Sequence, residues 1–421
     1  MEFIYWVFIK IYGLVIKMAS LFNGKAKDWV TGRRFYFQAL KHSLPKEEQR
    51  IWFHCSSLGE FEQGLPLLQE LRNQYPEYKI VLTFFSPSGY NIKKNDAAAD
   101  YIYYLPLDGP ANSSKFIELV NPSLAFFVKY EFWHFYIKAL HKKKIPVFVI
   151  SAIFRPSQIY FKWYGFFFYA ILRRVTHLFV QDQASLILLY NNRLANVTVS
   201  GDTRFDRVVK NKLIPNPVNG LNEFKNNQPI LIAGSTWPAD EALLIQMINT
   251  WQSNWKYIIV PHEINSTAIE KMRWQISLPT ILYSELSEMD QEQKAQKQVL
   301  IIDNIGLLSR LYVYGNIAYI GGGFGAGIHN ILEAAVFGLP VVFGPKYQKF
   351  KEANEMVDLR SAFSIHDYTG LYECIKSLAE NELERKDIAT ENLHYIESKC
   401  GATNIIIDYL KMNYPKLNTA S

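Results

Sequence analysis

The segment "IWFHC" at residues 51–55 leads directly into "SSLGEFEQGLPLLQEL" at residues 56–71. The first run is short and apolar, as in a buried strand, whereas the second has the apolar spacing of a helix. A strand followed directly by a helix is the repeating unit of a parallel sheet, because parallel strands need a crossover connection. The segment therefore predicts an α/β protein in which residues 56–60 lie at the carboxyl edge of a sheet, where ligands bind.

The same alternation continues in two blocks. Apolar β-rich runs separated by helical patterns occur six times between residues 51 and 202 and six times between residues 230 and 345. Residues 211–229, "NKLIPNPVNGLNEFKNNQP", are rich in Asn and Pro and have no clear period, which is typical of a linker. We predict two doubly wound, Rossmann-like domains at residues 25–210 and 230–421, with a linker at 211–229 and a ligand cleft between the domains.

The composition narrows the class of protein. The chain has 421 residues, of which 49% are hydrophobic, and this is enough for two ordinary cores. A net charge of +6 allows nucleic acid, an anionic membrane surface or a phosphorylated substrate as partner. The three cysteines are widely spaced and form no metal-binding or disulfide pattern, so we expect a reducing compartment.

Residues 1–24, "MEFIYWVFIKIYGLVIKMASLFNG", are apolar but contain Lys10 and Lys17. A lysine at the middle of a bilayer costs about 2.5–3.5 kcal/mol, which disfavours a membrane span. Lys10, Gly13, Lys17 and Ser20 recur at helical spacing and predict a narrow polar stripe on a helix that lies in the membrane interface. The alternatives are a core helix of the first domain and a single membrane span.

Glycines gather in "YIGGGFGAGIHNILEAAVFGLPVVFGP" at residues 319–345. A strand ends in Gly321–Gly323, and a helix begins near His329 and Asn330 with Glu333 in its first turns. Glycines allow a ligand to approach the backbone, and a helix N-terminus favours an anion. The dinucleotide pattern GxGxxG is absent, so a Rossmann oxidoreductase is disfavoured. The alternative is a tight turn that binds nothing.

A second junction, "GST" at residues 234–236, also ends a strand before a helix. The hydroxyl groups of Ser235 and Thr236 are candidates for holding a phosphate, or else for capping the helix. At the junction between the predicted strand at residues 51–55 and the helix that follows it, Glu60 is either a catalytic carboxylate or a partner of the helix dipole. We expect the helix N-terminus to lower the pKa of Glu60 and keep it ionised.

Together, "SSLGEFEQGLPLL", "GST" and "GIHNILEAAVFGLPVVFGP" followed by "FKEA" resemble the bacterial Kdo transferases (glycosyltransferase family 30), where Kdo is 3-deoxy-D-manno-octulosonic acid. "VKYEFW" at residues 128–133 and "SGDTRFDRV" at residues 200–208 are also similar to the family. The resemblance covers nearly the whole chain. It implies the GT-B fold, with two Rossmann-like domains, an interdomain cleft and a membrane-associated N-terminal helix.

The resemblance also implies an activity. The family transfers Kdo from CMP-Kdo to the lipid A precursor, lipid IVA, in lipopolysaccharide core synthesis, with inversion at the anomeric carbon and without a metal or other cofactor. The expected partners are CMP-Kdo, the lipid A precursor and the membrane surface, and no nucleic acid. The expected location is the cytoplasmic face of the inner membrane, with a monotopic or single N-terminal anchor.

Site residues follow from the resemblance. It implies that Glu60 is the catalytic base and that Glu131, Arg204 and Asp206 lie on the acceptor side. It places "GPK" and "FKEA" where they close the donor pocket. The residues implied to bind the CMP part of the donor are Ser235, Thr236, His262, Gly327, His329, Asn330 and Glu333.

Three positions depart from the family's pattern. The family's Pro-Arg-His is replaced by "VPHEI", so His262 stands where an Arg is expected. Gly-Gly-His-Asn reads Gly-Ile-His-Asn, and an acid expected after "DNIG" is Leu307. The alternatives are a GT-B enzyme that uses a UDP-sugar on a lipid acceptor, a UDP-sugar epimerase, and a non-catalytic peripheral membrane protein.

Overall fold

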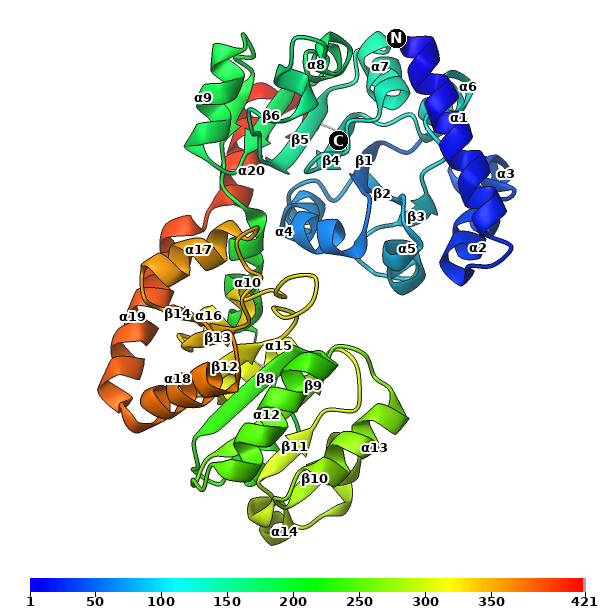
Figure 1. Cartoon of the computed structure of the whole chain (residues 1–421). Coiled ribbons are helices and arrows are strands. Elements are labelled where there is room, and N and C mark those ends of the chain that lie inside the picture. The colour runs from blue at the N-terminus through cyan, green and yellow to red at the C-terminus, as the bar shows by residue number, and fades with distance from the viewer. Residues whose placement is uncertain (215, 419–421) are drawn as a thin grey trace. The chain divides into compact units, whose positions relative to one another are not determined.

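The computed structural model describes residues 1–214 and 216–418, which form two compact units (Figure 1). The first unit comprises Met1–Arg207 and the chain from Lys399 onward, and the second comprises Val208–Ser398. This division differs from the expected domains at 25–210 and 230–421, because the C-terminal segment returns to the first unit. The expected linker at 211–229 lies within the second unit and contains a short helix, α11 (Leu221–Lys225).

The first unit is built on a parallel seven-stranded sheet of order β3-β2-β1-β4-β5-β6-β7. Its strands are β1 (Arg50–Cys55), β2 (Lys79–Phe84), β3 (Tyr101–Tyr104), β4 (Leu124–Val128), β5 (Val147–Ala152), β6 (His177–Val180) and β7 (Val197–Val199). Its helices are α1 (Glu2–Ala19), α2 (Gly24–Thr31), α3 (Tyr36–Ser43), α4 (Leu58–Gln74), α5 (Pro87–Lys93), α6 (Pro110–Val120), α7 (His134–Lys142), α8 (Phe166–Leu172), α9 (Gln183–Asn191), α20 (Ala402–Asn413) and the first residues of α10 (Thr203–Leu213).

The second unit has another parallel seven-stranded sheet, of order β10-β11-β9-β8-β12-β13-β14. Its strands are β8 (Ile230–Thr236), β9 (Lys256–Pro261), β10 (Thr280–Leu282), β11 (Val299–Ile301), β12 (Ile317–Ile320), β13 (Val341–Phe343) and β14 (Ala362–Ser364). Besides α11, its helices are α12 (Pro238–Thr250), α13 (Ser266–Gln275), α14 (Gln291–Gln296), α15 (Leu308–Leu311), α16 (Leu332–Ala335), α17 (Lys351–Asp358), α18 (Tyr368–Glu380) and α19 (Glu382–Lys399). The predicted pair of doubly wound parallel sheets is thus confirmed.

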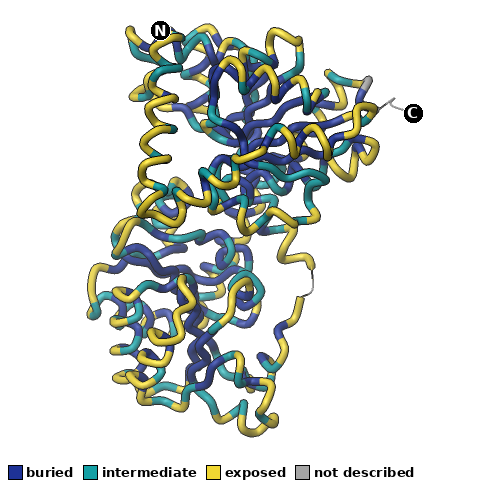
Figure 2. Tube along the Cα trace, turned by 90° about the vertical axis from the view of Figure 1, so that its right-hand side faces the viewer, coloured by how far each residue is buried: buried dark blue, intermediate teal, exposed yellow. Residues whose placement is uncertain are grey.

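Both faces of the first sheet are covered, because side chains that alternate along a strand point to opposite faces. Trp52 of β1 packs in one core with Phe116 and Tyr136, whereas the next residue, Phe53, packs in the other core with Leu67. Figure 2 shows buried segments, in dark blue, running through the interior of each unit. A sheet buried on both faces explains why "IWFHC" is continuously apolar rather than alternating.

The last helix, α20, completes the core of the first unit. Ile406, Ile407 and Leu410 are buried in the same core cluster as Leu67 and Leu71 of α4. Figure 1 shows α20, in red, among the elements of the first unit. The first unit therefore needs residues that lie about two hundred positions further along the chain.

Helix α1 packs on the first unit by one face. The Tyr5 hydroxyl donates a hydrogen bond of 2.7 Å to Asp108, Ile9 is buried, and Gly13 lies against the side chain of Leu107. The prediction that Gly13 shares one polar stripe with the lysines is wrong, because Gly13 faces the protein while Lys10 and Lys17 are exposed. Among residues 1–214 and 216–418, no helix is both long enough and apolar enough to cross a membrane.

Candidate active site

Glu60 lies at the carboxyl edge of the first sheet, as the sequence predicts. Strand β1 ends at Cys55, Ser57 is the N-cap of α4, and Glu60 is in the first turn of that helix. Its Oε2 accepts a hydrogen bond of 2.5 Å from the backbone N–H of Ser56. The turn between strand and helix thereby holds the carboxylate close to its own backbone.

The expected direction of the Glu60 pKa is wrong. Burial of the carboxyl group, followed by the charge of Glu131, raises the pKa of Glu60 to about 7. The backbone N–H groups of Ser56 and Ser57 and the Lys129 ammonium act in the opposite direction. Desolvation and a second carboxylate together outweigh the helix N-terminus. A carboxyl group with a pKa near neutrality suits a general base.

Glu131 lies between β4 and α7 and is held by two aromatic side chains. Its Oε2 accepts a hydrogen bond of 2.7 Å from Trp133 Nε1, and it lies 3.3 Å from His54 Nε2. His54 is fully buried in β1, with its Nδ1 2.8 Å from the Thr83 hydroxyl. His54 was not predicted as a site residue, because a histidine inside an apolar strand is typical of a protein core.

Arg204 and Asp206 have partners within the first unit. Arg204 Nε donates a hydrogen bond of 2.8 Å to Asp202, whose other oxygen accepts one from Gln63 of α4. Asp206 accepts hydrogen bonds from the backbone N–H of Gly401, at 2.6 Å, and of Thr403, at 2.7 Å, and from the Thr403 hydroxyl, at 2.6 Å. Asp206 therefore fixes the beginning of α20.

In the second unit, the predicted donor-binding residues gather around the ends of three neighbouring strands, β9, β8 and β12. Ser235 has a left-handed backbone conformation (φ 53°) at the irregularity between β8 and β9, and the hydroxyl of Thr236 donates a hydrogen bond of 3.0 Å to Glu241. Gly321 packs its backbone directly on that of Ser235, which leaves no room for a side chain. The glycine run thus lets two strand ends meet.

His262 and His329 belong to one aromatic cluster. Their rings are stacked with centroids 4.2 Å apart, and the His262 ring also stacks on Trp237 with centroids 4.7 Å apart. Trp237 Nε1 donates a hydrogen bond of 2.9 Å to His329 Nε2. Trp237 was missed by sequence reasoning, although it follows "GST" directly.

Asp240 connects the turn after β8 with the glycine-rich turn after β12. Its Oδ2 accepts hydrogen bonds of 2.9 Å from the backbone N–H groups of Trp237 and Gly322, and its Oδ1 accepts one of 2.7 Å from the Tyr319 hydroxyl. Both oxygens of this buried carboxylate thus have hydrogen-bond partners. Asp240 therefore sets the geometry of the cluster.

The remaining donor-side residues lie beside this cluster in sequence. Asn330 Nδ2 donates a hydrogen bond of 3.2 Å to Glu333, in the first turn of α16. Gly327 (φ 137°) lies against the ring of Phe350, and Lys346 Nζ donates a hydrogen bond of 2.9 Å to the carbonyl of Gly325. The "GPK" and "FKEA" segments thus contact the glycine-rich loop.

Metal-ligating side chains do not cluster in the described part of the chain. Across residues 1–214 and 216–418, no group of three or more His, Cys, Asp or Glu side chains is arranged to hold a metal ion.

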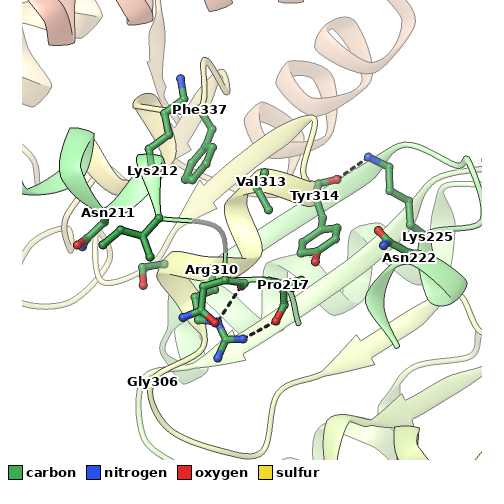
Figure 3. A pocket seen from close by; sticks show the side chains of 13 residues that line it. Asn211, Lys212, Pro217, Asn222, Lys225, Gly306, Arg310, Val313, Tyr314 and Phe337 are labelled. Carbon is green, nitrogen blue, oxygen red and sulfur yellow. Dashed lines mark hydrogen bonds between the residues drawn. The ribbon is translucent and has the colours of Figure 1, made fainter. Parts of the chain in front are cut away.

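A cavity of about 740 Å³ lies elsewhere in the second unit and contains none of the predicted site residues (Figure 3). Its basic side chains all bind backbone carbonyl oxygens: Lys212 that of Val336, Lys225 that of Tyr314, and Arg310 those of Asn216 and Pro217. Figure 3 shows the three charged ends pointing in different directions. They do not converge on a common anion, so we do not assign this cavity to the reaction.

Comparison with known proteins finds relatives that match most of the chain. Residues 31–207 match the protein-family model described as 3-deoxy-D-manno-octulosonic-acid transferase (kdotransferase). A relative named 3-deoxy-D-manno-octulosonic acid transferase from Aquifex aeolicus is 28% identical over 367 residues, covering 84% of this chain and 94% of the relative. One of the same name from Rickettsia bellii is 24% identical and covers 97% of both chains.

Solved structures share the fold. The UDP-GlcNAc 2-epimerase of Neisseria meningitidis aligns with a TM-score of 0.60 at 15% identity, over 87% of this chain and 100% of its own. The MurG protein of Acinetobacter baumannii aligns with a TM-score of 0.55 at 12% identity, over 87% and 99%. At such low sequence identity, these structures support the fold and nothing further. The sequence matches, by contrast, identify the chain as a relative of the bacterial 3-deoxy-D-manno-octulosonic acid transferases and thus as a glycosyltransferase.

Proposed function

We propose that the protein transfers Kdo from CMP-Kdo to a hydroxyl group of the lipid A precursor, lipid IVA, in lipopolysaccharide core synthesis. The names of the relatives support Kdo transfer, and several of them match most of the chain. The observation that carries the proposal is Glu60, a largely buried carboxylate at a sheet edge whose pKa is raised to about 7.

Glu60 is the general base of the proposed reaction. It removes the proton of the acceptor hydroxyl as that oxygen attacks the anomeric carbon of Kdo. The bond between this carbon and the phosphate oxygen breaks, and CMP leaves with the bonding electrons. Attack on the face opposite the leaving group inverts the configuration. A positioned base of this kind contributes about 10²–10⁴-fold to the rate.

We propose that residues of the second unit bind the donor. At the β8–α12 junction, the Ser235 hydroxyl and the backbone N–H groups of the glycine-rich turn after β12 are the proposed donors to the phosphate of CMP, while Thr236, whose hydroxyl is bound to Glu241, lies beside them. Glu333 is proposed to accept hydrogen bonds from the ribose hydroxyls. His262 and His329 belong to the same group of proposed donor-binding residues. On the acceptor side we propose Glu131 and Arg204. We propose that the hydroxyl, backbone N–H and imidazole groups on the donor side stabilise the leaving CMP without a metal ion.

We further propose that α1 attaches the enzyme to the inner membrane from its cytoplasmic side. The face of α1 opposite Tyr5 and Ile9 consists of exposed apolar side chains: Phe3, Ile4, Phe8, Ile11, Leu14, Val15 and Met18. Lys10 and Lys17 are also exposed. An apolar face with lysines near it is typical of a helix that lies in the headgroup region. A surface location would give access to a lipid acceptor.

One incubation tests the central proposal. The protein is mixed with CMP-Kdo and tetra-acylated lipid A precursor, and the product is measured by mass spectrometry in the presence and absence of excess chelator. We expect an increase equal to one or more Kdo residues in both cases. Absence of product with CMP-Kdo, or product with a UDP-sugar instead, would refute the assignment, and a strict need for a divalent cation would refute metal independence.

A further inference from the structure

Trp237 stands at the start of α12 and meets His329 edge to edge. The planes of the two rings are only 10° apart, and the indole Nε1 lies 2.9 Å from His329 Nε2. His262 stacks on both rings. The backbone N–H of Trp237 is bound by Asp240, so the indole is held at its base as well as along its edge.

This contact determines which nitrogen of His329 carries the proton. An indole N–H can only donate a hydrogen bond, so His329 Nε2 must be the acceptor and must be unprotonated. A neutral imidazole carries its single proton on the other nitrogen, which here is Nδ1. For Nδ1, the described residues offer no hydrogen-bond partner.

We infer that Trp237 is a positioning residue that locks His329 as the neutral Nδ1–H tautomer, so that Nδ1–H donates a hydrogen bond to a phosphate oxygen of the donor nucleotide. The inference deepens the proposed function and rests on it for the identity of the ligand. It assigns His329 the role of a fixed neutral donor rather than that of a proton source for the leaving group.

The surroundings of His329 favour the neutral ring. Burial and the adjacent His262 lower the pKa of His329 to about 4, while Asp240 acts in the opposite direction. Among the described residues, His262 and Asp240 are the titratable groups that act on the ring, and the Trp237 N–H is bound to it. Protonation would also place a hydrogen on Nε2 and break the bond from Trp237. Hydrogen bonding through Nδ1 should therefore persist unchanged across neutral pH.

The test uses the full-length protein with isotope-labelled histidine. Long-range ¹H–¹⁵N spectra distinguish the two neutral tautomers and the protonated ring, and His329→Gln identifies the signal. Trp237→Phe keeps an aromatic ring but removes the N–H. Trp251→Phe, at the other end of α12, is the matched control. If Trp237→Phe does not fold, benzothienylalanine at position 237 removes the N–H while keeping the shape of the ring.

In the unmodified protein we expect a single Nδ1–H tautomer of His329 throughout neutral pH. Trp237→Phe should populate the Nε2–H tautomer, raise the pKa of His329 and weaken CMP binding about three- to tenfold, as expected for one neutral hydrogen bond. Trp251→Phe should change none of these. An Nε2–H or protonated ring at pH 7, or an unchanged tautomer in Trp237→Phe, overturns the inference. If CMP does not bind the unmodified protein, the proposed function fails, and the spectra still decide the tautomer.

Discussion

At the scale of single residues, the ionised form of Glu60 that catalysis requires is also the form that lowers the stability of the fold. Its ordinary pKa of 4.5 rises to about 7 in the folded protein, so the native state binds this proton more tightly than the unfolded chain. The stabilising effect of that proton is complete below about pH 4.5 and is lost as the pH rises towards 7. Above neutrality the ionised base therefore destabilises the fold that positions it.

Glu60→Gln should abolish most activity and also stabilise the protein. The amide cannot accept the proton, so kcat should fall by about 10²–10⁴-fold. The amide also carries no charge to desolvate, so the free energy of unfolding should rise by at most about 3 kcal/mol at pH 8 and remain unchanged at pH 4. Activity assays and urea unfolding at the two pH values measure both effects.

Glu62→Gln is the control for this variant. Glu62 is two residues further on but pairs with Arg207 at 2.6 Å and Lys93 at 3.7 Å, and its loss should not raise stability at pH 8. Near-normal turnover in Glu60→Gln, or a dead Glu62→Gln, would show that the base is misassigned.

Glu131→Gln should move the pH dependence of the reaction. Glu60 must be ionised to act, so kcat/KM of the unmodified enzyme should fall as the pH drops below about 7. The charge of Glu131 is the second cause of the raised pKa of Glu60, after burial. Its removal should shift the acidic limb of the pH profile to lower pH, whatever happens to the maximal rate. An acidic limb that stays in place would mean that Glu131 does not act on the base.

At the scale of elements, the sequence predicts the central strands and one edge strand of each sheet, and it misses the other edge strand. The six apolar runs in each block correspond to strands, whereas β3 and β14 were not predicted. Both lie at the edge of a sheet, and most of their residues are only partly buried. "YIYY" and "AFS" therefore lack the continuous apolar character that marks a central strand. Tyr101 and Tyr103 of β3 are only partly buried, whereas Tyr104 is buried.

The first turn of α4 offers a test of substrate approach. A Cβ added to Gly59 would meet no atom within 4 Å, so the open space beside Glu60 is available to a substrate. Gly59→Ala should stabilise the helix by about 0.5–1 kcal/mol, since alanine loses less backbone entropy on folding. It should nevertheless lower kcat/KM by about tenfold or more, because a displaced substrate reacts slowly.

Gly24→Ala is the matched control for Gly59→Ala. It also adds a methyl group in open space within a helix, α2, away from Glu60. It should leave activity unchanged. Equal kinetics in the two variants would indicate that no substrate passes close to Gly59.

Helix α1 offers a test of membrane attachment. Lys10→Glu combined with Lys17→Glu should reduce sedimentation with anionic vesicles, since each lysine near the surface contributes about 1 kcal/mol. Phe8→Ser with Val15→Ser should reduce it on neutral vesicles as well, because these changes remove exposed apolar area. Lys271→Glu with Lys411→Glu makes the same change in net charge elsewhere and should sediment normally. Full sedimentation of both α1 variants would leave α1 without a role at the membrane.

At the scale of the whole molecule, the order of elements along the chain does not reveal which elements fold together. The sequence pattern predicts two parallel sheets, but nothing in "ATNIIIDYLKMN" indicates that α20 packs on α4. The isoleucines of α20 fit a buried face in either unit. The same limit applies to the site, where Glu60 is found from its motif, while its pKa is raised by burial and by the charge of Glu131, a residue far along the chain. Distant contacts of this kind are absent from local patterns.

Asp206 provides the last test, because it separates a structural role from a catalytic one. The family resemblance places Asp206 on the acceptor side, whereas the structure shows it accepting three hydrogen bonds from Gly401 and Thr403 at the start of α20. Asp206→Asn removes the charge and one acceptor oxygen from this cap, and buried α20 side chains depend on its placement. We expect the free energy of unfolding to fall by about 1.5–3 kcal/mol, as for hydrogen bonds to a charged group. The activity of the protein that remains folded should stay near normal. Urea unfolding and activity per folded molecule measure the two quantities separately. If the stability were unchanged and kcat fell strongly, Asp206 would instead be assigned to the acceptor site.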